Sequence, residues 1–212
     1  MDPQLTQALK AAPTNEYLLQ GSILDSSVDI LICRLKGLCD NSDGPEEKFV
    51  DHEMVYAIKS TNIQQPLQFS VRHSLMQPEN WQLRYLGHSE MGDKSRHTLI
   101  RNCVDVATSD NVVQFLQEAG FRLDHEFVVR GYYFHKGRMK VTVSKILKMI
   151  QQGITTSDNL ESIVPSYLVE LSVLAMSGQD AIAEDMKNFA EQLKPLVQLE
   201  KIDHRRLQGT GT

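Results

Sequence analysis

The chain has 212 residues, of which 41% are hydrophobic and 23% charged, enough apolar material for one sizeable buried core. Its 22 basic and 27 acidic side chains give a formal net charge of −5. This charge argues against a general nucleic-acid binder, which needs a basic face. There is no apolar run of membrane-spanning length and no signal-peptide pattern, and the three cysteines form no C-x-x-C motif. These features predict an intracellular protein with reduced thiols.

The first third of the chain predicts a tail, a strand and a helix. Residues 1–15 have no clean period and contain two prolines, so we expect a mobile tail. Residues 16–24 read as a strand, and Asp25 or Ser26 is positioned to cap the helix that follows. Ser26 and Asp29 fit a capping box. The apolar stripe of this helix is Val28, Leu31, Ile32, Leu35 and Leu38.

The middle of the chain predicts several strands and one short helix. The expected strands are residues 50–60, 67–75, 81–86 and 97–107, separated by loops that include residues 87–94. A helix follows, with Ser109 or Asp110 as its cap and Gly120 just beyond its end. Its predicted apolar stripe is Val112, Phe115, Leu116 and Ala119.

A long hairpin over residues 122–150 is the strongest structural pattern in the sequence. Leu123, His125, Phe127 and Val129 alternate with Arg122, Asp124, Glu126 and Val128, and the second arm alternates in the same way. This period of two is typical of paired antiparallel strands, and Lys136 with Gly137 suits the tight turn between them. Arms of this length favour a large curled sheet or a barrel.

The remaining elements complete the predicted fold. We expect a loop over residues 151–165, a strand over 167–173 and a helix that begins near Asp180 and is ended or kinked by Pro195. Residues 195–203 fit either a final strand or another helical turn. Many strands with few helices indicate a mainly β protein with α: a many-stranded antiparallel β-barrel with helices packed outside. We expect one domain over residues 16–203, followed by a frayed tail over 204–212.

Two D-H-E clusters are the most prominent candidates for a metal site. They are Asp51, His52 and Glu53, and Asp124, His125 and Glu126. In a strand the two acids share one face while the histidine points to the other, so each cluster offers carboxylates that suit Mg²⁺ or Mn²⁺ better than zinc. Coincidence, or two exposed strand starts, is the alternative interpretation. A local basic cluster is formed by Lys94, Arg96, His97 and Arg101. It could bind phosphate or an acidic partner, and a solvated strand end is the alternative interpretation.

A barrel with a charged interior suggests a triphosphate-tunnel enzyme, which lines its barrel with carboxylates for metal and with basic groups for phosphates. The first strand of such enzymes carries Glu-x-Glu-x-Lys, but the matching positions here are Glu16, Leu18 and Gln20. A metal-dependent phosphohydrolase therefore stays as the alternative function. It would use Asp124, Glu126 and Glu170, with Arg72, Arg130 or Lys140 meeting phosphate.

Long stretches of the sequence resemble the family of subunit 18 of the Mediator complex, in a version typical of animals. They are residues 16–25 (EYLLQGSILD), 34–41 (RLKGLCDN), 51–55 (DHEMV), 84–97 (RYLGHSEMGDKSRH), 101–109 (RNCVDVATS), 167–173 (YLVELSV) and 185–203 (DMKNFAEQLKPLVQLEKID). The tail before residue 16 and the loop over 151–165 do not share the resemblance.

The resemblance implies a fold and a function. The fold is an antiparallel barrel similar to the RNA triphosphatase tunnel. The function is that of a non-catalytic subunit of the Mediator head module, which couples transcriptional regulators to RNA polymerase II in the nucleus. The implied partners are Mediator subunit 20 and a C-terminal helix of subunit 8, with helix-in-groove recognition of the latter. No cofactor, metal ion, catalytic residue, membrane contact or direct sequence-specific nucleic-acid contact is implied, and no partner-binding residue is assigned.

Overall fold

The structure is a computed structural model that describes residues 14–40, 44–58, 67–89, 97–176 and 179–202. The described helices are α2 (Val28–Leu38), α3 (Val112–Glu118) and α4 (Asp180–Glu191), with short 3-10 turns η1 (Asp25–Ser27) and η2 (Ser157–Asn159). The strands are β1 (Thr14–Leu24), β2 (Glu47–Ile58), β3 (Leu67–Ser74), β4 (Trp81–Ser89), β5 (Leu99–Thr108), β6 (Arg122–Lys136), β7 (Met139–Met149), β8 (Leu160–Ser162) and β9 (Ser166–Met176).

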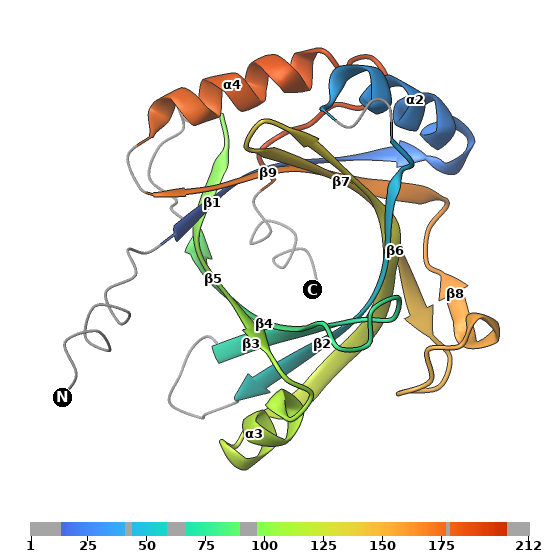
Figure 1. The fold of residues 1–212 in the computed structure, drawn as a ribbon, viewed down its shortest axis with the longest axis vertical. Coiled ribbons are helices and arrows are strands. Elements are labelled where there is room, and N and C mark those ends of the chain that lie inside the picture. Colours follow the sequence, from blue (N-terminus) through green and yellow to red (C-terminus); the bar gives the residue numbers. More distant parts are fainter. Residues whose placement is uncertain (1–13, 41–43, 59–66, 90–96, 177–178, 203–212) are drawn as a thin grey trace, which may run out of the picture.

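The strands close into an antiparallel barrel, which confirms the predicted fold class (Figure 1). Their order in the nine-stranded sheet is β6-β2-β3-β4-β5-β1-β9-β7-β8, and a further pairing between β6 and β7 joins the ends. The short β8 lies outside the ring as an addition beside β7. No helix of the described residues is long and apolar enough to cross a membrane.

Helices cover two sides of the barrel from outside (Figure 1). The apolar stripes of α2 and α4 share one core with outward side chains of β1, β7 and β9, including Tyr17, Val143 and Leu171. On the opposite side, α3 packs against β2, β3 and β4, where Val71 and Leu116 are buried. Burial of these outer faces orients every strand, because successive side chains alternate between the two faces.

The predicted hairpin is confirmed as β6 and β7, with Lys136 opposite Met139. Gly137 has a φ of 56°, the left-handed conformation that the turn requires. Gly131 is needed for another reason: a Cβ there would lie 2.1 Å from the carbonyl oxygen of Val143. The two strands therefore approach each other within the barrel wall more closely than any larger residue allows.

Several predicted details differ from the structure. Neither Asp25 nor Ser26 caps α2; the N-cap is Ser27, which makes no side-chain cap hydrogen bond, and η1 precedes it. The predicted cap of α3 is likewise replaced by Asn111, again without a cap hydrogen bond. Phe115, assigned to the buried stripe, is 63% exposed, because α3 is short and buries only a narrow face.

Element boundaries also shift relative to the prediction. The expected loop over residues 151–165 contains η2 and β8, and β4 continues to Ser89 into the expected polar loop. Thr14 and Asn15, which were assigned to the predicted N-terminal tail, are the first two residues of β1. The rest of that tail and residues 204–212 lie outside the described residues. After α4, residues 192–202 form turns and a single bridge between Glu200 and Gln20.

Candidate functional site: the polar inner face of the barrel

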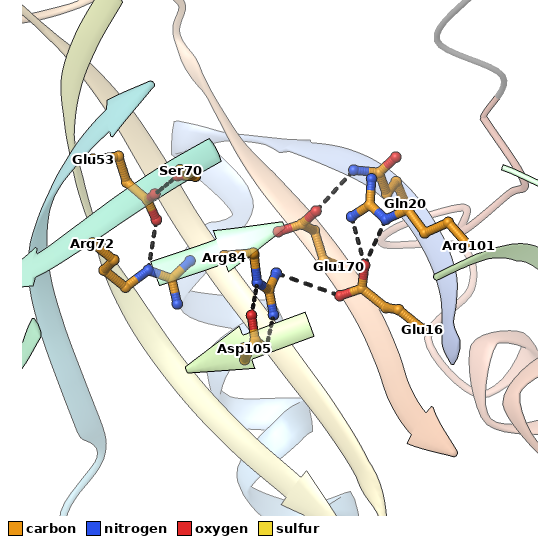
Figure 2. Close-up of polar contacts among 9 residues, drawn as sticks. All are labelled: Glu16, Gln20, Glu53, Ser70, Arg72, Arg84, Arg101, Asp105 and Glu170. Atoms are coloured by element: carbon orange, nitrogen blue, oxygen red, sulfur yellow. Dashed lines mark hydrogen bonds and ion pairs between the residues drawn. The ribbon is translucent and has the colours of Figure 1, made fainter. Parts of the chain in front are cut away.

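The inner face of the barrel gathers charged side chains from strands that are distant in sequence. Tyr17 and Leu171 face the outer core, so their neighbours Glu16 and Glu170 point inward. Residues directly opposed in paired strands share a face, and the register carries this face around the ring. Its charged side chains are Glu16, Asp51, Glu53, Arg72, Arg84, Arg101, Asp105, Lys140 and Glu170. Figure 2 shows all of these except Asp51 and Lys140.

Glu16 is the acid most completely enclosed by cations. It is 4% exposed, and its Oε2 accepts a hydrogen bond from Nε of Arg101 at 2.6 Å. Nη2 of Arg101 lies at the same distance, and Nη1 of Arg84 lies 3.6 Å from Oε1. Glu16 is the one acid retained at the tunnel-enzyme positions, and here two guanidinium groups on its own barrel wall occupy it (Figure 2).

Arg84 and Asp105 form a two-point ion pair across β4 and β5. Nε and Nη2 of Arg84 donate to Oδ1 and Oδ2 of Asp105 at 2.6 and 2.8 Å. Burial alone would raise the pKa of Asp105, but the hydrogen bonds and charge of Arg84 outweigh it and hold that pKa below its usual value. The fork geometry fixes the orientation of the guanidinium group inside the barrel.

Glu53, Arg72 and Ser70 form a third cluster on β2 and β3 (Figure 2). Nε of Arg72 donates to Oε1 of Glu53 at 2.6 Å, and the Ser70 hydroxyl donates to Oε2 at 2.8 Å. Asp51 lies farther from Arg72, with 3.7 Å between Oδ2 and Nε. Burial is the main reason that the pKa of Asp51 is raised.

Glu170 differs from the other acids because its partner is neutral. Oε1 of Glu170 accepts a hydrogen bond of 2.8 Å from Nε2 of Gln20, the residue at the last tunnel-enzyme position. All three arginines of the inner face are thus held by carboxylates, while Glu170 is held by an amide. These carboxylates fix the orientation of the three arginine side chains within the barrel.

Lys140 is the exception among the inner cations. It lines a cavity of about 460 Å³ at the end of the barrel near β2, β3 and β7. Its ammonium nitrogen lies 3.8 Å from the ring centroid of Tyr133. Burial, followed by repulsion from Arg72 and Arg84, lowers the pKa of Lys140 to about 8.

The residues assigned to the alternative enzyme are not brought together. Glu126 lies on the outer face of β6, where its Oε2 contacts Nε2 of His52 at 2.8 Å and its Oε1 accepts from the backbone N–H of Gly153. Asp124 contacts the exposed His125. Arg130 also shares the outward parity of Glu126. Only Arg72, Lys140 and Glu170 of the predicted set face the interior, so that constellation is not formed.

The two D-H-E clusters meet, but not as a metal site. The first is buried: Asp51 and Glu53 face the interior while His52 turns outward to Glu126 of the second. The prediction of two exposed strand starts is therefore wrong for the first cluster. Within the described ranges, no group of three His, Cys, Asp or Glu side chains is arranged to hold a metal ion.

The predicted basic cluster is divided by the barrel wall. Arg101 points inward to Glu16, whereas Nε2 of His97 lies 3.3 Å from Nζ of Lys187 on α4. Lys94 and Arg96 lie outside the described residues. The three cysteines are free thiols, as predicted, and burial is the main reason that the pKa values of Cys39 and Cys103 are raised to about 11.

Sequence reasoning missed the pairing of Arg84 with Asp105 and of Arg101 with Glu16. A signal was present in β5, where Arg101, Cys103 and Asp105 recur at every second position. That spacing indicates a polar face opposite the apolar one. The partners could not be named, because they lie on strands whose register is set by the closed barrel.

The fold and its inner face define a class of protein: an antiparallel tunnel-like barrel whose interior arginines are paired with carboxylates. Comparisons with known proteins identify the family. The model of the family described as Med18 protein matches residues 15–78 and 59–208. This chain therefore belongs to the Med18 family.

Relatives of similar length share much of the sequence. Mediator of RNA polymerase II transcription subunit 18 of Danio rerio is 58% identical over 193 residues, which are 91% of this chain and 90% of the relative. The Drosophila melanogaster protein of the same name is 52% identical, covering 93% of this chain and 90% of its own length.

Solved structures show the same fold at low sequence identity. A chain in the Schizosaccharomyces pombe Mediator head module superposes with a TM-score of 0.71 at 16% identity, covering 89% of this chain and 98% of that one. A putative adenylate cyclase from Vibrio parahaemolyticus gives a TM-score of 0.57 at 11% identity, over 92% and 98% of the two chains. Identities this low indicate a shared architecture only.

Proposed function

We propose that this protein is a non-catalytic interaction subunit of the Mediator head module that acts in the nucleus. The observation that carries the proposal is its membership of the Med18 family, with relatives named as Mediator subunit 18 at 52–58% identity over about nine-tenths of the chain. Through sister subunits, it would help to couple transcriptional regulators to RNA polymerase II. The barrel then serves as a rigid scaffold whose outer surface carries the contacts.

The inner face supports a structural role for the barrel. Each inner arginine is bound by a carboxylate at 2.6 Å, so its positive charge is offset within the barrel wall and attracts a phosphate less strongly. The acids Asp124 and Glu126 of the alternative phosphohydrolase lie outside the inner face, away from Glu170. The alternative thus lacks the convergent carboxylates that two-metal or single-metal phosphate chemistry requires.

The outer surface has apolar side chains suited to partner contacts. Val104 and Val106 on β5 are 50% and 47% exposed, Phe115 on α3 is 63% exposed, and Ile30 on α2 is 58% exposed. We propose that contacts with two neighbouring subunits lie on these separate faces. We propose Mediator subunit 20 and the C-terminal helix of subunit 8 as those neighbours, the latter bound in a groove.

Reconstitution tests this proposal. The full chain is co-expressed with Mediator subunit 20 and the C-terminal segment of subunit 8, and the mass of the product is measured by size-exclusion chromatography with light scattering. A stoichiometric complex is expected. A folded chain that stays monomeric beside its folded partners, and that hydrolyses inorganic triphosphate with Mn²⁺, would replace the proposal by the enzymatic alternative.

Matched surface variants locate the contacts. Phe115→Ser on α3 and Ile30→Ser on α2 lie on opposite sides of the barrel. Because both side chains are exposed, each substitution leaves the core intact. Loss of one partner from one variant, with the other variant unaffected, assigns that partner to a face. The circular dichroism spectrum of each variant should match that of the parent chain.

A further inference from the structure

The inner cavity beside Lys140 has a chemical property that the scaffold role does not use. Lys140 on β7 projects into the cavity of about 460 Å³, against the Tyr133 ring at 3.8 Å. The volume of the cavity is larger than that of a small acyl group.

The surroundings of Lys140 are net repulsive toward a positive charge. Arg72 and Arg84 both oppose its protonation, and the acids that would balance these arginines, Glu53 and Asp105, are already bound to them. Asp51 and then Asp105 act in the opposite direction, each more weakly than either arginine. With its pKa at about 8, Lys140 holds a sizeable fraction of neutral amine at neutral pH.

Another buried lysine on the same strand shows the contrast. Nζ of Lys145 donates to both carboxylate oxygens of Asp25, at 2.5 and 2.7 Å, and Lys145 is only 4% exposed. A carboxylate thus occupies the nitrogen of Lys145 on both of its oxygen atoms, and little of the side chain is accessible. Lys148, three residues further, is exposed to water. The strand therefore provides three lysines in three environments.

We propose that Lys140 is an acylation site, at which the side-chain amine accepts a small acyl group from an acyl thioester. The amine lone pair attacks the carbonyl carbon, a C–N bond forms, and the C–S bond breaks. The thiolate leaves with the electron pair and takes up the proton that the nitrogen loses. The product is a neutral amide inside the cavity, where repulsion from Arg72 and Arg84 no longer acts on it.

The expected selectivity follows from two opposing effects. Relative to an ordinary lysine with a pKa of 10.5, a pKa of about 8 increases the neutral fraction near pH 7.5 by roughly two orders of magnitude. The lower basicity reduces intrinsic nucleophilicity by about one order. A net advantage of about tenfold over an ordinary lysine remains, before any loss from restricted access to the cavity.

Residue-resolved labelling tests the proposal. The folded full chain is treated with S-acetyl-N-acetylcysteamine between pH 6.5 and 10, and acetylation of Lys140, Lys145 and Lys148 is followed by peptide mass spectrometry. Lys140 should react about tenfold faster than Lys148 at pH 7.5, with a rate that levels off above pH 8, and Lys145 should react least. Labelling of Lys140 no faster than Lys148, or a rate still rising at pH 10, would overturn it.

Two variants sharpen the outcome. Asp51→Asn removes the acid that favours the charged form of Lys140, so the midpoint of its rate profile should move to lower pH. Lys148→Arg removes the exposed site and should leave that profile unchanged. Acetylation at Lys140 should also raise the thermal midpoint of the chain, whereas the same modification at Lys148 should not. An unchanged midpoint after complete Lys140 acetylation would contradict the electrostatic basis of the proposal.

Discussion

Glu16 and Glu170 offer a direct test of the idea that paired charges hold the interior of the barrel together. Both acids face inward on adjacent strands, but Glu16 is bound by two arginines and Glu170 by the Gln20 amide. Glu16→Gln leaves Arg101 without an anionic partner in a buried site, a loss of about 3 kcal/mol of unfolding free energy. Glu170→Gln removes a charge whose partner is neutral and should cost about 1 kcal/mol.

Urea denaturation at pH 7 measures the difference between these two variants. The midpoint should fall more for Glu16→Gln than for Glu170→Gln, with an unchanged slope in both, because the surface exposed on unfolding stays the same. Arg101→Met in the Glu16→Gln background should recover part of the loss, since it removes the unpaired cation. Equal losses in the two single variants would refute the account of the interior as a charge-paired network.

Three further predictions concern other parts of the barrel. Lys140→Met should stabilise the chain at pH 7 by about 1–3 kcal/mol, because burial and neighbouring cations penalise the ammonium. Between pH 8 and 10.5 the unfolded chain binds more protons at Lys140 than the folded chain does, so the unfolding free energy of the parent chain should rise with pH across that window. The Lys140→Met variant should lack this rise. Urea titrations at several pH values measure the difference. Gly131→Ala should cost several kcal/mol or prevent folding. Gly37 is an exposed position of helix α2, where a Cβ would meet nothing within 4 Å, so Gly37→Ala should stabilise the chain by about 0.5–1 kcal/mol in thermal melts. Cys33 should react rapidly with a disulfide reagent at pH 7.5 while Cys103 stays protected until unfolding; fast modification of two or more thiols in the native chain would contradict the burial.

The elements that could be predicted are those whose signal is local. The hairpin arms alternate over more than ten residues, and Gly137 at the turn adopts the expected positive φ. The stripe of α2 and the stop at Gly120 after α3 were equally clear. The strand β8 escaped prediction because its three residues are too few to show a period.

The interior could not be predicted because its pairs are non-local. Glu16 and Arg101 are 85 positions apart, and their contact depends on barrel closure. In addition, both faces of these strands are partly buried, so apolar content did not distinguish inside from outside. The face of β6 that carries Phe127 and Val129 points into the barrel, so Asp124 and Glu126 lie on the outer face of that strand. The alternation was therefore correct, while the assignment of Asp124 and Glu126 to an interior site was wrong.

Incorporation into the Mediator complex is the most direct test of the central claim. A tagged copy of the chain is expressed in animal cells, recovered from nuclear extract, and the co-purifying subunits are quantified by mass spectrometry against an untagged control. The account predicts recovery of the other head-module subunits in near-stoichiometric amounts. A folded, nuclear chain that recovers none of them would contradict it.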